Sequence, residues 1–165
     1  MRSVETTPEP PETAPAPTPG TEARQAWMSR LARAPEARLA ALWAASGLDP
    51  DFAWLRAPES GAVMLRGRAG AVGAPFNLGE MTVTRCALRL ACGTVGHAMT
   101  QGRSKEKARI AALCDALMQG AQAGRVRAAI LDPLEREAGA RAAARATRAA
   151  ATRVEFFTMV RGENA

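Results

Sequence analysis

Large apolar side chains recur at helical spacing between residues 21 and 47. The first group consists of Trp27, Met28 and Leu31. The second group consists of Leu39, Leu42 and Trp43. Each group covers one face of a helix. Thr21 stands where a cap of the first helix is expected, Pro35 stands at the first turn of the second, and Gly47 stands at its end. The pattern predicts a helical hairpin over residues 21–47.

The middle of the chain changes to a period of two, which is typical of β-strands. Residues 62–68 predict one strand, after a short turn that starts at Asp49 and holds Phe52, Trp54 and Leu55. A glycine-rich loop, Gly70–Gly79, follows it. In the next strand, two sets of side chains alternate: Thr82, Thr84, Cys86, Leu88 and Leu90 against Met81, Val83, Arg85, Ala87 and Arg89. Cys92-Gly93 is placed for a tight turn into a third strand over residues 94–100.

The last third of the chain is mostly helical in pattern. Ser104 is placed to cap a helix that ends at Gly120, with Ile110, Leu113, Leu117 and Met118 turned inward. Asp132-Pro133 opens another helix that runs to about Ala151, and Val154–Val160 predicts a closing strand. Strands and helices do not alternate strictly. The predicted fold class is therefore α+β, an antiparallel sheet of about four strands packed with helices from both termini.

The first twenty residues differ from the rest in composition. Proline recurs six times between Pro8 and Pro19, among Thr, Ala and Glu, and little there is large enough to bury. We interpret residues 1–20 as a disordered tail, with a polyproline ligand for a partner as the alternative. Residues 21–165 are then a single domain, which suits a chain of 165 residues with 47% hydrophobic composition.

Charge and cysteine content narrow the range of possible binding partners and cellular compartments. Lys and Arg total 22 against 16 acidic residues, and nearly all of the cations are Arg, which pairs well with phosphate and carboxylate. Aromatic residues make up 4% and Tyr is absent, which disfavours a platform for stacking bases. Three Cys, no secretory signal and no apolar run long enough to span a membrane lead us to expect a cytoplasmic protein.

Familiar ligand motifs do not account for the loop Gly70–Gly79. It lacks the Lys and Ser/Thr of a P-loop, and the strand after it excludes a dinucleotide fingerprint. A flexible connection, a subunit contact and ligand binding stay open. Arg66 and Arg68 share a face of their strand, as do Arg85 and Arg89 of theirs, so pairing of these strands predicts four guanidinium groups on one face. Such a face meets solvent, acidic side chains or an anion.

Two further groups of residues are weaker candidates. His97, with Cys86 and Cys92, matches no metal-ligand spacing, so we expect no metal and a packing or hydrogen-bonding role for His97. No nucleophile with a base and an orienting carboxylate is visible, and the catalytic residues stay unknown. The helix of residues 135–153 scatters Arg136, Arg141, Arg145, Arg148 and Arg153, which favours a solvated helix over a nucleic-acid contact.

Several motifs in order resemble the PhnG family, the G subunits of the bacterial carbon–phosphorus lyase core complex. They are Arg24–Met28, Gly73–Cys86, Gly102-Arg103, Asp115–Gln119 and Thr152–Glu163. The resemblance covers roughly residue 21 to the end of the chain. It implies phosphonate catabolism, in which ribose 5-triphosphate is transferred from ATP to methylphosphonate and adenine is released.

The resemblance also implies partners and cofactors. The H, I, J and L subunits are the expected partners, with the I subunit the most direct, and no membrane or nucleic acid is expected. This chain is expected to bind no cofactor: MgATP is a substrate of the complex, and the iron–sulfur cluster belongs to another subunit. The alternative function is that of a basic accessory protein that binds nucleic acid and has no enzymatic activity.

The residue-level prediction centres on Arg85. Arg85 and Arg89 are expected to bind an anion or a partner, with Arg68 and Arg103 as weaker candidates for the same surface. Polar residues before Arg85 and a glycine that permits close approach predict an interface loop at Asn77, Gly79 and Glu80.

Overall fold

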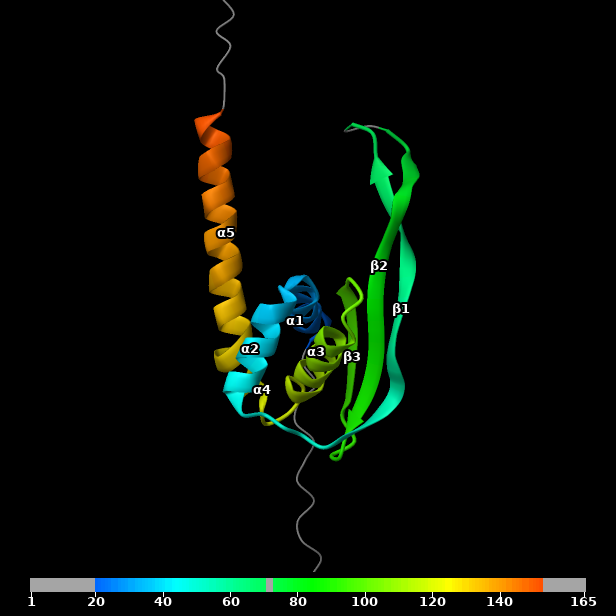
Figure 1. Ribbon diagram of the computed structural model, residues 1–165, viewed down its shortest axis with the longest axis vertical. Helices are drawn as coiled ribbons and strands as arrows, with labels where there is room; N and C mark the ends of the chain where they lie inside the picture. The colour runs from blue at the N-terminus through cyan, green and yellow to red at the C-terminus, as the bar shows by residue number, and fades with distance from the viewer. Residues whose placement is uncertain (1–19, 71–72, 153–165) are drawn as a thin grey trace, which may run out of the picture.

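Helices cover one face of a three-stranded antiparallel sheet in the computed structural model, which describes residues 20–70 and 73–152 (Figure 1). The order along the chain is α1 (Thr21–Arg33), α2 (Glu36–Ser46), β1 (Phe52–Arg68), β2 (Pro75–Leu90), β3 (Val95–Gln101), α3 (Lys105–Leu117), α4 (Ala123–Val126), the π-helical η1 (Arg127–Leu131) and α5 (Asp132–Ala151). The sheet order is β1-β2-β3. The α+β class is confirmed. The described part holds three strands, and the predicted strand Val154–Val160 lies outside it, as does the tail up to residue 19.

The predicted helices are confirmed, with small corrections at their starts. Gly20 rather than Thr21 holds the N-cap position of α1, and no side chain caps it. The Ser104 hydroxyl accepts a hydrogen bond from the Lys107 amide at 3.1 Å, as expected of an N-cap. Gly47 ends α2 at φ 60°, in the left-handed region that favours glycine. Asp132-Pro133 does not open a new helix, because α5 continues directly from α4 and η1.

The first two strands are longer than predicted, whereas the third lies one residue from its predicted place. The expected turn at residues 49–55 is wrong, because β1 begins at Phe52 and already contains Trp54 and Leu55. The loop Gly70–Gly79 is also wrong in extent, because β2 begins at Pro75. Cross-strand pairing explains both differences. Each added stretch is paired with the predicted part of the other strand in one long hairpin, from Phe52↔Leu90 at the core end to Arg68↔Pro75 at the far end.

The core lies between α3 and the sheet. One side of β2 sends Thr84, Cys86, Leu88 and Leu90 into it, which confirms the predicted alternation. The helix α3 is buried on nearly all sides, with α1 and α2 packed against it opposite the sheet. Gly96 of β3 allows the sheet to approach α3 closely. A Cβ atom there would lie 2.0 Å from the Ala112 carbonyl oxygen, so any side chain would push the helix away.

Two arms extend from the same end of this core (Figure 1). The first arm is the outer part of the β1–β2 hairpin, which we define as residues 59–70 and 73–80, and none of these residues is buried. The second arm is the outer part of α5, residues 138–151, where every residue is exposed. Neither arm packs its side chains into the common core.

Candidate functional site

A buried carboxylate joins α1, β3 and α3. Asp115 has 0% of its surface exposed and sits on α3 among apolar neighbours. The Arg24 guanidinium of α1 donates to both carboxylate oxygens, at 3.1 and 2.7 Å. The Trp27 indole N–H donates at 3.0 Å, and the backbone N–H of His97 donates at 2.9 Å. Four donors satisfy the buried charge, so Asp115 fixes the places of three elements.

The same cluster closes half of the outer edge of β3. Two edge groups of this strand bind side chains of α3 and of the residues directly after it. The N–H of His97 donates to Asp115, and the carbonyl oxygen of Val95 accepts from the side-chain amide of Gln119 at 2.9 Å. Gln119 also donates to the Asp115 carbonyl oxygen at 2.9 Å. Hydrogen bonds from Asp115 of α3 and from Gln119 just after it therefore occupy the edge up to His97.

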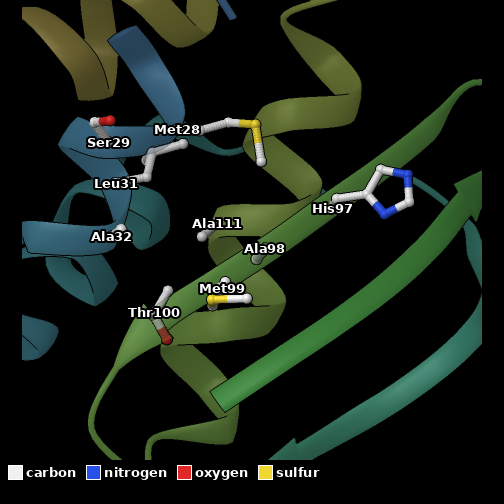
Figure 2. Close-up of a pocket in the computed structure, with 9 residues that line it drawn as sticks. All are labelled: Met28, Ser29, Leu31, Ala32, His97, Ala98, Met99, Thr100 and Ala111. Carbon is white, nitrogen blue, oxygen red and sulfur yellow. The ribbon is translucent and has the colours of Figure 1, made fainter. Parts of the chain in front are cut away.

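Beyond His97, a cavity opens between α1 and β3 (Figure 2). Its volume is about 180 Å³, and Met28, Ser29, Leu31 and Ala32 of α1 line it against His97–Thr100 of β3, with Ala111 of α3 also lining it. Its lining is mostly apolar. The imidazole of His97 points away from the α1 residues in Figure 2. The buried Thr100 hydroxyl has no hydrogen-bond partner among the described residues.

Arg85 lies on the open face of the sheet. Its guanidinium donates to Glu59 of β1 at 2.8 Å, and Arg56 lies 3.7 Å from the same carboxylate. All three side chains are about half exposed. A second hollow on this side, lined in part by Arg56, Arg85, His97 and Met99, adjoins the α1–β3 cavity through shared residues. Water screens such pairs, so this group stabilises the fold little and remains accessible.

The four guanidinium groups predicted to share one sheet face lie at two distant levels of the hairpin. Arg66 pairs across the hairpin with Asn77 and Arg68 with Pro75, whereas Arg85 pairs with Glu59 and Arg89 with Ala53. From the level of Asn77 to that of Arg85 is about 27 Å, at roughly 3.4 Å per strand residue. The length of the hairpin thus separates the two pairs of Arg.

The remaining predicted residues lie in three places. Asn77, Gly79 and Glu80 are on the hairpin arm, inside β2 and not in a loop, and all are exposed. Arg89 is exposed near the core end of the same strand. Arg103 is exposed in the turn between β3 and α3. The structure therefore separates Arg68 from Arg85 along the hairpin, and the binding role of each predicted residue remains a prediction.

Three arginines of α5 lie on one face of the helix, whereas the sequence predicted that they lie scattered around it. Arg141, Arg145 and Arg148 are spaced by four and then three residues along one continuous helix, so they share one face. Arg136 lies off that face, and Arg153 lies outside the described residues. The prediction of a scattered set is wrong for these three.

No group of three or more His, Cys, Asp or Glu side chains within residues 20–70 and 73–152 is placed to hold a metal ion. Cys86 is buried and its thiol donates to the Ala108 carbonyl oxygen at 3.2 Å, whereas the His97 side chain is exposed. Burial raises the pKa of Cys86 to about 11 and that of Cys114 to about 12. Both thiols are therefore protonated and poor nucleophiles at neutral pH.

Sequence reasoning missed the Asp115 cluster and the cavity beside it. A signal for the first was present, because Asp115 is the single charge in an apolar helical run, and such a charge needs a partner. Arg24 and Trp27 belonged to the quoted motifs, but nothing in the sequence paired them with Asp115. The cavity left no signal, because it depends on how α1 rests against the strand edge.

These features define an α+β chain with a structural ion-pair centre and a projecting apolar hairpin. None of its described helices is long and apolar enough to cross a membrane. The family described as "Phosphonate metabolism protein PhnG" matches residues 22–162. Over 149 residues the chain is 45% identical to "Alpha-D-ribose 1-methylphosphonate 5-triphosphate synthase subunit PhnG" of Rhizobium meliloti (strain 1021), covering 88% of this chain and 93% of that relative. The chain therefore belongs to the PhnG family, and its role is that of a subunit in phosphonate metabolism. These matches support the phosphonate interpretation and not the nucleic-acid-binding alternative.

Proposed function

We propose that this chain is the G subunit of an enzyme that makes α-D-ribose 1-methylphosphonate 5-triphosphate from MgATP and methylphosphonate, with release of adenine. It acts there with H, I and L subunits, and J joins the larger assembly. In this proposal the I subunit is the direct neighbour and carries the nucleosidase chemistry. The present chain completes or positions the site and binds no cofactor of its own, and the iron–sulfur cluster belongs to another subunit. The assembly works in the cytoplasm.

The observation that carries a subunit role is the apolar hairpin. Among the described residues, seven large hydrophobic side chains are exposed, and six of them lie on β1 or β2: Trp54, Leu55, Met64, Leu65, Phe76 and Leu78. Leu78 is 65% exposed. Four of the six, Met64, Leu65, Phe76 and Leu78, lie on the projecting arm of the hairpin, and apolar surface gathered in this way is typical of a protein–protein contact. It supports a chain whose stable form includes a partner.

An omission assay tests the proposal. The H, I and L subunits are mixed with this chain, MgATP and methylphosphonate, and adenine is measured by chromatography. We expect adenine from the full set, and none above a buffer blank from this chain alone or from the set without it. Adenine release by this chain alone would contradict the assignment of the chemistry to another subunit. Unchanged release without this chain would contradict the whole proposal.

A pair of variants links the assay to the hairpin. Phe76 and Leu78 are exposed, so their joint replacement by serine leaves the isolated fold intact and weakens assembly. The matched control is Ala146→Ser on the α5 arm, where a small exposed side chain changes equally little in the fold. We expect adenine release to fall for the hairpin variant only.

A further inference from the structure

The two edge strands of the sheet differ in how easily a further strand could pair with them. The edge strand β1 carries Pro58, and its register with β2 shifts at three places: between Trp54 and Arg56, between Arg56 and Glu59, and between Leu65 and Arg66. Prolines and bulges are devices that prevent further strand pairing. The other edge strand, β3, has no proline and pairs with β2 in unbroken register from Val95 to Gln101. The edge of β3 is thus the one built to accept a strand.

Hydrogen-bond alternation shows which groups of β3 point outward. The N–H of His97 binds the side chain of Asp115, and the carbonyl oxygen of Val95 binds that of Gln119. Alternate residues of β3, counted from Val95, therefore direct their backbone groups away from β2. Met99 and Gln101 occupy the next two positions of this alternation, so their backbone groups also point away from β2. Within the described chain, no side chain or loop backbone group bonds the outward N–H or C=O of Met99. The edge is closed up to His97 and open from Met99 onward.

The open stretch of edge adjoins the α1–β3 cavity. Met28 and Ala32 of α1 face Met99 and Thr100 across it, and Ala111 of α3 also lines it (Figure 2). Thr100 adds a hydroxyl that is buried yet unpartnered, in a residue that is 1% exposed. A free strand edge beside a helix, with apolar lining between them, is the arrangement that accepts an extended peptide as an added strand.

We propose that the edge of β3 from His97 to Gln101 binds an extended segment of a partner subunit, which adds to the sheet as a fourth strand. The backbone of that segment pairs with the outward N–H and C=O groups of Met99 and Gln101. One of its apolar side chains enters the cavity beside Met28 and Ala111. This inference rests on the proposed function only in taking the partner to be another subunit of the same enzyme.

The chain's own ends suit this place poorly. The helix α5 carries Thr152 about 27 Å beyond Leu134, at 1.5 Å per residue. Returning from there to the core would take about eight residues at roughly 3.4 Å each, which uses up the apolar segment Val154–Val160 on the way. The residues before Gly20 include Pro15, Pro17 and Pro19, which have no N–H to donate to a strand.

Hydrogen exchange of the wild-type chain tests the pairing directly. Backbone amides are followed in the isolated chain and in the complex formed with the H, I, J and L subunits. We expect exchange at Met99 and Gln101 to slow at least about tenfold on assembly. Equal exchange at these amides in both states overturns the inference. Failure of the wild-type chain to join any complex is a different result, which contradicts the proposed function itself.

Two proline variants separate the open half of this edge from its closed half. In Met99→Pro the lost N–H points away from β2, so no bond within the sheet is removed. The matched control is Val95→Pro at the first position of β3, where the N–H likewise points away from β2 but lies in the half of the edge that hydrogen bonds already close. We expect both variants to keep the circular dichroism of the wild type, and only Met99→Pro to lose assembly. Normal assembly of a folded Met99→Pro chain overturns the inference.

A third variant covers the case in which proline disturbs the fold. Thr100→Val removes the unpartnered hydroxyl and keeps the side-chain shape, so the isolated chain should melt no lower than the wild type. In the complex the partner segment would satisfy this hydroxyl, so we expect the affinity of Thr100→Val for the partner subunits to fall severalfold. Unchanged affinity counts against the cavity as part of the site. The inference would also be overturned if the Met99 amide already exchanged slowly in the isolated chain, and if deletion of residues 1–19 or dilution of a self-associated form made that exchange fast. Either result would show that this chain itself occupies the edge of β3.

Discussion

The strand β2 has two halves that meet different surroundings. From Val83 to Leu90, the side chains on one face of the strand are buried against α3, and Leu88 is 0% exposed. From Pro75 to Glu80, every residue is exposed on both faces, although Phe76 and Leu78 are as apolar as the residues of the core half. Both halves are paired with β1 over the same hairpin. The difference lies in the helical layer, which covers one half and ends before the other.

This contrast separates two sources of stability. The core half is held by burial and by the Asp115 cluster, which act within this chain. The hairpin arm is held by its own strand pairing, and its apolar side chains stabilise nothing until another surface covers them. Changes in the core half should therefore lower the stability of the isolated chain, whereas changes in the arm should act mainly on assembly.

The largest effect should follow loss of the Asp115 carboxylate. Asp115→Ala leaves the donors of Arg24, Trp27 and His97 without their acceptor, so we expect a loss of about 3–5 kcal/mol in the free energy of unfolding. The control is Glu135→Ala, which removes an exposed partner of Arg30 and should cost less than about 1 kcal/mol. Urea unfolding followed by circular dichroism measures both. Similar costs for the two variants would show that Asp115 does not anchor the core.

Leucine truncation in the two halves of β2 gives the next largest difference. Leu88→Ala opens a cavity in the core and should cost about 3 kcal/mol. Leu78→Ala removes the same atoms from an exposed site and should change the stability of the isolated chain by less than about 0.5 kcal/mol. Association with the partner subunits should weaken for Leu78→Ala. Equal losses of stability in urea would remove the distinction between core and arm.

Replacement of Arg85 should have a smaller effect on the stability of the isolated chain and a clear effect on assembly. Its exposed pair with Glu59 predicts that Arg85→Ala costs the isolated chain less than about 1 kcal/mol. We expect the same variant to disrupt assembly or phosphonate-dependent growth, because its place beside Met99 and the open strand edge suits a partner contact. Arg145→Ala on the α5 arm should do neither. Equal and mild effects from both would place Arg85 outside the interface.

The smallest effects near neutral pH concern the cysteines. Burial raises the pKa of Cys86 and Cys114, whereas a hydrogen bond with Thr94 lowers the pKa of the exposed Cys92. At pH 8 we expect iodoacetamide to modify Cys92 and to spare the other two, as judged by mass spectrometry. The unfolded chain releases the Cys86 and Cys114 protons from about pH 9, below their folded pKa values of about 11 and 12. Stability should therefore fall as pH rises through that window, and rapid modification of Cys114 at pH 8 would show an open core.

The sequence alone determined most of the helices and strands, because the local spacing of apolar residues differs between a helix and a strand. Leu39, Leu42 and Trp43 marked a helix face, and the alternation from Thr82 to Leu90 marked the buried side of β2. The motifs also identified the family. All of these features lie within a few residues of one another, so no knowledge of distant contacts was needed.

The tertiary structure decided where the layers end and which distant groups meet. The exposed half of β2 carries the same kinds of residue as a buried strand, and only the extent of α3 and its neighbours leaves Phe76 and Leu78 outside. Arg24 and Trp27 reach Asp115 across 91 and 88 positions of sequence, and the cavity beside β3 exists only because α1 rests against that edge. Burial and hydrogen-bond partnership are properties of packed layers, so local spacing does not determine them.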